Sequence, residues 1–166
     1  MTDTIYKEIR NKYDLTREQV CDKATQLNKV LQKERLERIE NAKYPITPEE
    51  VMTLAELYGE PSLCNYYCSN ECPIGEKYVP EIKVKDLAQI VLEMLSSLNT
   101  LKKRQERLIE ITADGIIANE EIKDFVDIQK ELEKISVTVE TLQLWVEHMI
   151  ANNQIDIEEY NRIKKQ

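Results

Sequence analysis

Glycine and two of the aromatic residues are scarce in this sequence of 166 residues, which has three Gly, one Phe and one Trp. Alternating runs of β-branched residues are also few, and such runs together with glycine-containing turns are typical of sheets. This shortage argues against a β-sandwich or a β-barrel. The long segments rich in Leu, Ile, Glu, Lys and Gln favour helices, so we predict an all-α protein.

The chain lacks an apolar run of the length that spans a bilayer, and its polar N-terminus lacks the apolar stretch of a signal peptide. We therefore expect a cytoplasmic protein with no membrane partner. In that compartment thiols stay reduced, so the four cysteines are expected to be free rather than paired in disulfides.

Motifs that carry catalysis are missing as well. The single histidine, His148, has no nucleophile placed beside it by the sequence, and no phosphate-binding loop, nucleophile elbow or zinc-protease motif occurs. The many carboxylates fit the solvated faces of helices. We predict that the protein is not an enzyme and needs no cofactor.

Helix start and stop signals are concentrated in residues 15–59. Two threonines are each followed three positions later by Gln or Glu, which is the spacing of a capping box: Thr16 with Gln19, and Thr47 with Glu50. Pro48 suits the first position of a helix, and Gly59 is placed to end one. We predict three short helices here, preceded by a helix over residues 4–13.

The order of these helices, and the run Arg38-Ile39-Glu40-Asn41 followed by Lys43 and Pro45, resembles the phage-repressor/Cro-type helix-turn-helix family. The resemblance covers roughly residues 1–60. It implies a bacterial transcriptional regulator of repressor type, in which a recognition helix with Leu36 and Ile39 in its core enters the major groove of double-stranded DNA.

The resemblance also implies a set of DNA-binding residues. Lys33 and Arg35 would contact bases, Gln32 would cap the recognition helix, and Glu37 would face the groove. Phosphates would be held by Arg17, Arg38 and Lys43. The net charge is −8, with 10 basic and 12 acidic side chains in residues 1–60, so non-specific affinity is expected to be weak and sensitive to salt.

Three cysteines follow this region at a spacing of four residues: Cys64, Cys68 and Cys72. In a helix that spacing places them on one stripe. We interpret them as small buried side chains. A metal site or a redox role for the three thiols remains open as an alternative.

Residues 76–84, which include Pro80, are predicted to form an extended linker between a domain over residues 1–75 and a second domain over residues 85–166. In the second domain apolar residues repeat at the heptad spacing from Leu87 to Thr112 and again from Phe125 to Met149. With a short turn around Ala113–Gly115, these two segments predict a long antiparallel helical hairpin.

The hairpin has more apolar residues than a single seam on each helix requires. A wider apolar face implies burial against a further surface. The expected partner is the hairpin of a second copy, giving a homodimer, while packing on the N-terminal domain remains open. The dimerisation residues predicted in this way are Ile90, Leu95, Ile109, Leu144 and Trp145.

A rival hypothesis assigns the chain to another class, a protein-interaction module that has the helix-turn-helix fold without DNA affinity. Glu34 and Glu37 beside the basic residues fit that hypothesis, as does the acidic net charge. The hairpin would then bind a protein partner in its apolar groove. A continuous basic strip from Lys33 to Lys43 favours DNA, and a broken strip favours the interaction module.

Overall fold

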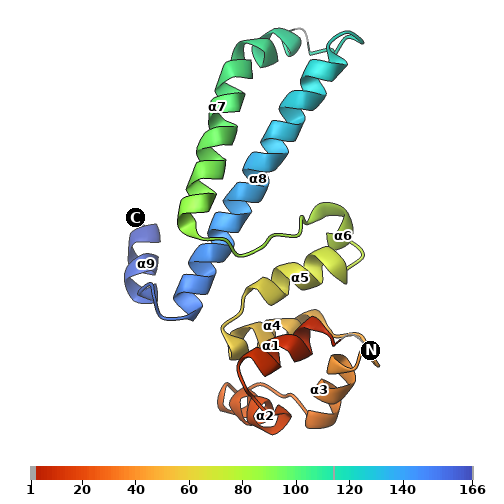
Figure 1. Ribbon diagram of the computed structural model, residues 1–166, viewed down its shortest axis with the longest axis vertical. Helices are drawn as coiled ribbons and strands as arrows, with labels where there is room; N and C mark the ends of the chain where they lie inside the picture. Colours follow the sequence, from red (N-terminus) through yellow and green to blue (C-terminus); the bar gives the residue numbers. More distant parts are fainter. Residues whose placement is uncertain (1–2, 114, 166) are drawn as a thin grey trace. The chain divides into compact units, whose positions relative to one another are not determined.

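The computed structural model describes residues 3–113 and 115–165, and every regular element in these residues is a helix (Figure 1). The expectation of an all-α protein is thereby confirmed. The helices of the described residues are α1 (Ile5–Lys12), α2 (Arg17–Gln26), α3 (Lys33–Glu40), α4 (Pro48–Tyr58), α5 (Ser62–Asn70), α6 (Gly75–Tyr78), α7 (Leu87–Ile111), α8 (Ile122–Ala151) and α9 (Ile157–Lys164). None of them combines the length and the apolar character needed to cross a membrane.

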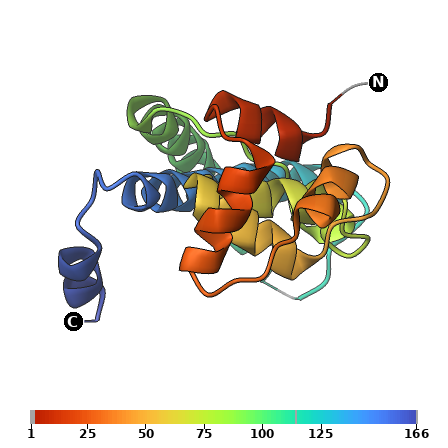
Figure 2. The ribbon, with the colours of Figure 1, turned by 90° about the horizontal axis from the view of Figure 1, so that it is seen from below.

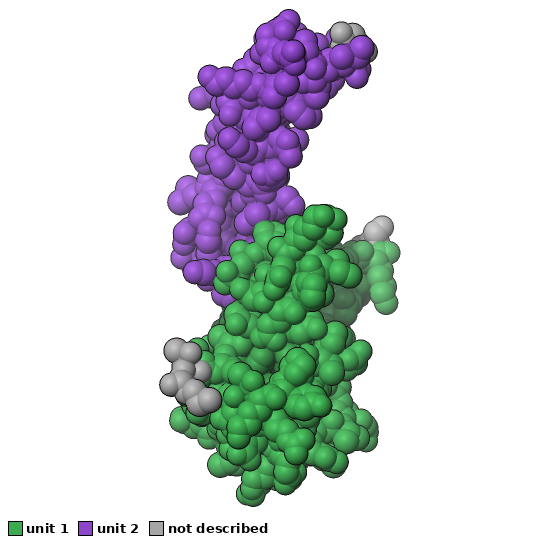
Figure 3. Space-filling model, turned by 90° about the vertical axis from the view of Figure 1, so that its right-hand side faces the viewer, with its two compact units in different colours: residues 1–81, 146–166 green, residues 82–145 purple. Residues whose placement is uncertain are grey.

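Two compact units make up the chain (Figure 3). Unit 1 consists of residues 1–81 and 146–166, and unit 2 consists of residues 82–145. The end of α8 therefore groups with the N-terminal helices, whereas the sequence assigned it to a separate C-terminal domain. The predicted linker, residues 76–84, also begins inside a helix, because α6 extends to Tyr78.

Contacts of the end of α8 explain why it belongs to unit 1. The side-chain Nδ2 of Asn152, directly after α8, donates to the carbonyl oxygen of Gly59 at 3.5 Å. Nε2 of His148 lies 3.8 Å from Oε1 of Glu60. Glu60 is itself buried, and it accepts hydrogen bonds from Lys12, Tyr13 and Ser62. Neither Glu60 nor this network was evident from local sequence patterns.

The predicted helix signals of unit 1 are confirmed. Thr16 and Thr47 are N-caps, and each forms the full capping box with the residue three positions later. Gly59 ends α4 in the left-handed conformation with φ of 62°, which glycine adopts without a steric penalty. Asp156 caps α9 by accepting hydrogen bonds from the backbone N–H groups of Glu158 and Glu159.

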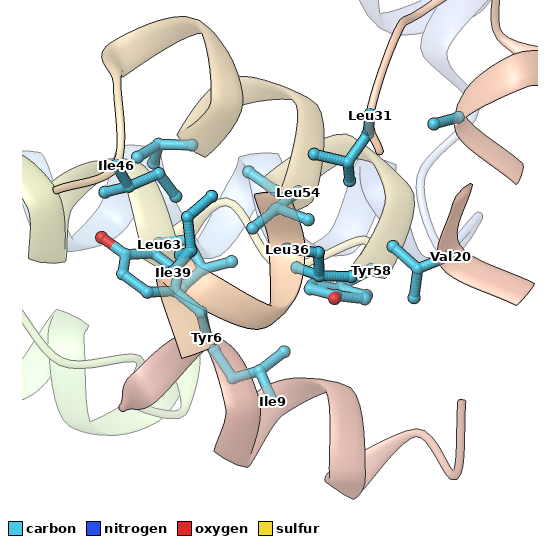
Figure 4. Packing of buried hydrophobic residues seen from close by; sticks show 13 residues of the cluster. Tyr6, Ile9, Val20, Leu31, Leu36, Ile39, Ile46, Leu54, Tyr58 and Leu63 are labelled. Carbon is cyan, nitrogen blue, oxygen red and sulfur yellow. The ribbon is translucent and has the colours of Figure 1, made fainter. Parts of the chain in front are cut away.

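The core of unit 1 lies between helices α1 to α5 (Figures 1 and 2): α1 and α2 each contact α3 and α4, and α4 contacts α5. Leu36 from α3 and Leu54 from α4 are fully buried, and Val20 from α2 lies in the same cluster (Figure 4). Burying a Leu or Val side chain stabilises a fold by about 1.5–3 kcal/mol. These contacts fix α3 from its inner side.

Unit 2 contains α7 and most of α8, which run antiparallel (Figure 1). Arg107 and Arg104 of α7 form ion pairs with Asp124 and Asp127 of α8 at 2.8 and 3.5 Å. The connection is longer than the short turn that we predicted, because α7 ends at Ile111 and α8 begins only at Ile122. Of the predicted turn, Asp114 lies outside the described residues.

The predicted heptad seams do not form a closed core in unit 2. Leu87, Val91 and Leu98 of α7 are exposed, as is Leu132 of α8. Ile90, which we placed off the seam, is fully buried. The heptad pattern identified the helices correctly, but it marked only part of the buried side of α7, because Met94, Leu101 and Leu108 of the predicted seam are partly buried while the residues alternating with them are exposed.

Candidate nucleic-acid interface

Helix α3 presents one polar side to solvent and one buried side to the core. Leu36, Ile39 and Glu40 are buried on the inner side. Lys33, Glu34, Glu37 and Arg38 are exposed, as is Gln32 at the N-cap. The Gln32 side chain makes no capping hydrogen bond, so the predicted capping role is wrong for the side chain although the position is right.

The buried carboxylate of Glu40 anchors the inner side of α3. Arg10 from α1 contacts its two oxygens at 2.5 and 3.0 Å, and Arg17 from α2 contacts Oε2 at 2.8 Å. Paired arginines are the partners that a buried carboxylate requires. The Arg17 guanidinium therefore has a structural partner inside the protein, and about a quarter of the side chain (26%) is exposed.

Arg35 is likewise held inside unit 1. Its Nε and Nη2 atoms contact the two oxygens of Glu50 at 2.6 and 2.7 Å, and Nη2 also donates to the carbonyl oxygen of Pro45 at 2.8 Å. Tyr44 lies against the guanidinium at 5.3 Å from the ring centroid. The hydrogen bond from Arg35 lowers the pKa of Glu50. Four contacts thus hold the Arg35 guanidinium against other residues of unit 1, although we predicted that it would contact a base.

The remaining predicted DNA-binding residues are exposed. Lys33 forms an ion pair with Glu18 of α2, and both side chains are largely open to solvent. Such exposed pairs contribute little and exchange partners easily. Glu37, Arg38 and Lys43 are exposed. The structure therefore leaves Lys33, Arg38 and Lys43 as the accessible cations of the predicted set.

A cavity at the beginning of α2 lies beside two of the predicted residues. It has a volume of about 280 Å³ and is lined by Arg10, Thr16, Arg17, Glu18 and Lys33. Helix N-termini with nearby cations favour anions such as phosphate. Sequence reasoning missed Arg10 here, because its position next to Arg17 depends on the packing of α1 against α3.

The three cysteines do not share one helical stripe. Helix α5 ends at Asn70, so Cys72 lies beyond it. Cys64, Cys68 and Cys72 are partly buried free thiols, and burial raises the pKa of Cys64. Among the residues that the structure describes, no group of three His, Cys, Asp or Glu side chains is arranged to hold a metal ion.

The five predicted dimerisation residues occupy different environments. Ile90 and Leu144 are buried within the chain, so neither is available for a partner, contrary to our expectation. Trp145 is partly buried. Leu95 and Ile109 are exposed to 53% and 61%. Two of the five are thus placed where a second molecule could reach them.

Comparisons with known proteins returned no match, whether the chain was compared with protein-family models, with curated proteins or with solved structures.

Proposed function

We propose that the protein is a DNA-binding regulator that docks the exposed side of α3 in the major groove of double-stranded DNA. The observation that carries this proposal is the two-sided construction of α3. Its inner side is fixed by Leu36, Ile39 and the Glu40 ion pairs, while its outer side chains are exposed to solvent. A helix presented in this manner fits the width of the major groove.

We assign the DNA-contacting residues from the exposure of their side chains. Lys33 and Gln32 stand at the N-terminal end of α3, from which base edges are usually read. Arg38 and Lys43 lie at its other end and contact phosphates. The cavity formed with Arg10 and Arg17 receives a further phosphate at the beginning of α2. Arg35 positions α3 through Glu50 instead of contacting a base.

Acidic residues limit the strength of this binding. Glu18, Glu34 and Glu37 are exposed around the same cations, and they repel phosphates. Glu37 can accept a hydrogen bond from cytosine N4. Binding therefore depends on a few specific contacts, and random DNA is bound weakly.

Selection of random duplex DNA by the pure protein at low salt tests the proposal. The expected result is enrichment of one sequence motif, and loss of the enrichment in the Arg38→Ala, Lys43→Ala double variant. A matched control is the Lys123→Ala, Lys130→Ala double variant, which removes two exposed cations from α8. Absence of any enrichment, or equal loss in both double variants, would contradict the proposal.

A second candidate function, a protein-interaction module, is favoured by one specific observation. The basic strip from Lys33 to Lys43 is broken, because Arg35 is bound by Glu50 and Lys33 is bound by Glu18. Under this alternative the exposed apolar residues of the hairpin are the surface that binds a protein partner. The selection experiment separates the two functions, since only the first predicts an enriched duplex.

A further inference from the structure

A cavity of unit 1 lies where α1, the loop after α3 and the end of α5 come together. It has a volume of about 320 Å³. Its lining residues are Thr4, Tyr6, Ile39, Ala42, Tyr44, Pro45, Ile46 and Glu71. This volume is at the small end of the range of ligand-binding pockets, so the cavity can hold a small molecule.

Two polar groups of this cavity, Tyr6 and Glu71, offer hydrogen-bond acceptors that lack a donor. The hydroxyl of Tyr6 donates to Oε1 of Glu71 at 3.0 Å. Because the single proton of the phenol is used in this bond, its oxygen can only accept a further hydrogen bond, and an ionised carboxylate can only accept. Among the residues that the structure describes, no Lys, Arg or His forms an ion pair with Glu71. The cavity therefore suits a ligand group that carries several N–H donors.

The electrostatics of the cavity favour a cation. Tyr6 is 2% exposed, and in Figure 4 its ring extends from α1 into the core with the hydroxyl directed toward Ile46. Glu71 as a whole residue is exposed, but partial burial of its carboxyl raises its pKa. A cation within hydrogen-bond distance offsets the cost of keeping such a carboxylate charged. Of the described residues that line the cavity, Glu71 alone carries a charge, so an anion would be repelled.

The rest of the lining is largely apolar. Ile39 and Ile46 are 2% and 6% exposed, and apolar walls of this kind take up the carbon skeleton of a ligand while a few polar groups fix its orientation. The guanidinium of Arg35 lies against the ring of Tyr44. Arg35 does not line the cavity, however, and its charge is paired with Glu50.

We propose that this cavity binds a small organic amine, with the ammonium group between Tyr6 and Glu71 and the carbon chain against the apolar lining. The ammonium donates charge-assisted hydrogen bonds to Oε2 of Glu71 and to the phenol oxygen of Tyr6. An alcohol with the same carbon chain forms only the weaker, neutral hydrogen bonds. None of the residues proposed to contact DNA lines this cavity, so the proposal is independent of DNA binding.

Titration of the isotope-labelled full chain with isoamylamine, followed by amide chemical shifts at neutral pH, tests the site. An alkylamine is protonated at this pH. Saturable shifts are expected in residues 39–46 and around Glu71. Isoamyl alcohol, which has the same carbon skeleton, should bind about tenfold more weakly, because hydrogen bonds of charged groups are the stronger ones. Ammonium chloride at the same concentration gives the background from ionic strength.

Two variants then test the role of the carboxylate. Glu71→Gln keeps the size of the side chain and an oxygen that can accept from Tyr6, but it removes the charge. It should lower the affinity for isoamylamine to about that for the alcohol. Glu76→Gln, an exposed change on α6 outside the cavity, should bind the amine as the wild type does. The amide spectrum of each variant without ligand verifies its fold. No saturable shift with the amine, equal affinities for amine and alcohol, or equal binding by the two variants would overturn the proposal.

Discussion

The guanidinium of Arg35 donates two hydrogen bonds, of 2.6 and 2.7 Å, to the two carboxylate oxygens of Glu50. This pair joins the middle of α3 to the beginning of α4. Glu50 is also the closing residue of the α4 capping box. One carboxylate therefore caps α4 and orients α3. This relationship explains why Arg35, which we predicted from the sequence to contact a base, is directed into the protein.

The pair predicts that Arg35→Ala acts on stability. Removing the guanidinium leaves Glu50 without its charged partner, and hydrogen bonds to charged groups contribute about 1.5–3 kcal/mol. We expect the free energy of unfolding, measured with urea, to fall by about 1–3 kcal/mol. The control is Arg38→Ala, an exposed residue of the same helix, for which a change within about 0.5 kcal/mol is expected. Equal stability of the two variants would refute the structural role of Arg35.

Arg38→Ala should instead act on DNA affinity. Each phosphate contact that is lost reduces the slope of log affinity against log salt by about 0.9. We expect this smaller slope for Arg38→Ala and again for Lys43→Ala, measured by fluorescence anisotropy on an enriched duplex across a salt series. A slope that stays at the wild-type value in both variants would remove these residues from the interface.

Glu40 should be the most sensitive charged residue of unit 1. It is 1% exposed and forms ion pairs with both Arg10 and Arg17. Breaking a buried ion pair by removing one partner costs about 3–5 kcal/mol, and Glu40→Ala would leave two arginines unpaired. Thermal unfolding should show a much lower Tm than that of Glu37→Ala, an exposed change on the same helix. Similar Tm values for the two variants would contradict the buried triad.

The stability of unit 1 should decrease at acidic pH. Arg35 holds the pKa of Glu50 below its ordinary value, so this carboxylate stabilises the fold above its unfolded pKa and loses that contribution as the pH falls through its folded pKa. Burial raises the pKa of Glu71. Protonation of this carboxyl therefore stabilises the fold as the pH falls, and it offsets part of the loss. Urea unfolding over an acidic pH series should give a flatter dependence for Glu50→Gln and a steeper one for Glu71→Gln. Identical pH dependences in the wild type and Glu50→Gln would contradict a contribution of Glu50 to the loss of stability in acid.

Gly75 is required for the approach of α6 to α5. A Cβ atom at this position would lie 1.9 Å from the carbonyl oxygen of Cys68, a backbone atom that cannot move away cheaply. Overpacking of this kind costs about 1–3 kcal/mol or more. Gly115→Ala is the matched control, because its Cβ would meet no atom within 4 Å and only the positive φ opposes it. The prediction fails if Gly75→Ala unfolds at the same urea concentration as the control.

Local signals predicted most of the helices, because caps and stop residues act over a few positions. Thr16, Thr47 and Gly59 each marked a helix end that the structure contains. Cys72 shows the limit of periodicity, since an i, i+4, i+8 spacing cannot show that the helix stops at Asn70. The long heptad seams located α7 and α8 but only part of their buried sides, which also depend on packing between helices.

The candidate site was predictable in position and only partly in its chemistry. The exposed residues of α3 follow from the placement of Leu36 and Ile39 in the core. The partners of Arg17 and Arg35 come from distant segments, Glu40 and Glu50, and no local pattern pairs such residues. His148 and Glu60 are also far apart in the sequence, so no local pattern predicts their contact.

Amide chemical-shift mapping of the isotope-labelled protein, titrated with an enriched duplex, tests the central claim most directly. The account predicts that the largest shifts fall on residues 32–43 and on the beginning of α2 around Arg17. Shifts confined to α7 and α8, or no shifts at a saturating concentration of duplex, would contradict DNA binding by the exposed side of α3.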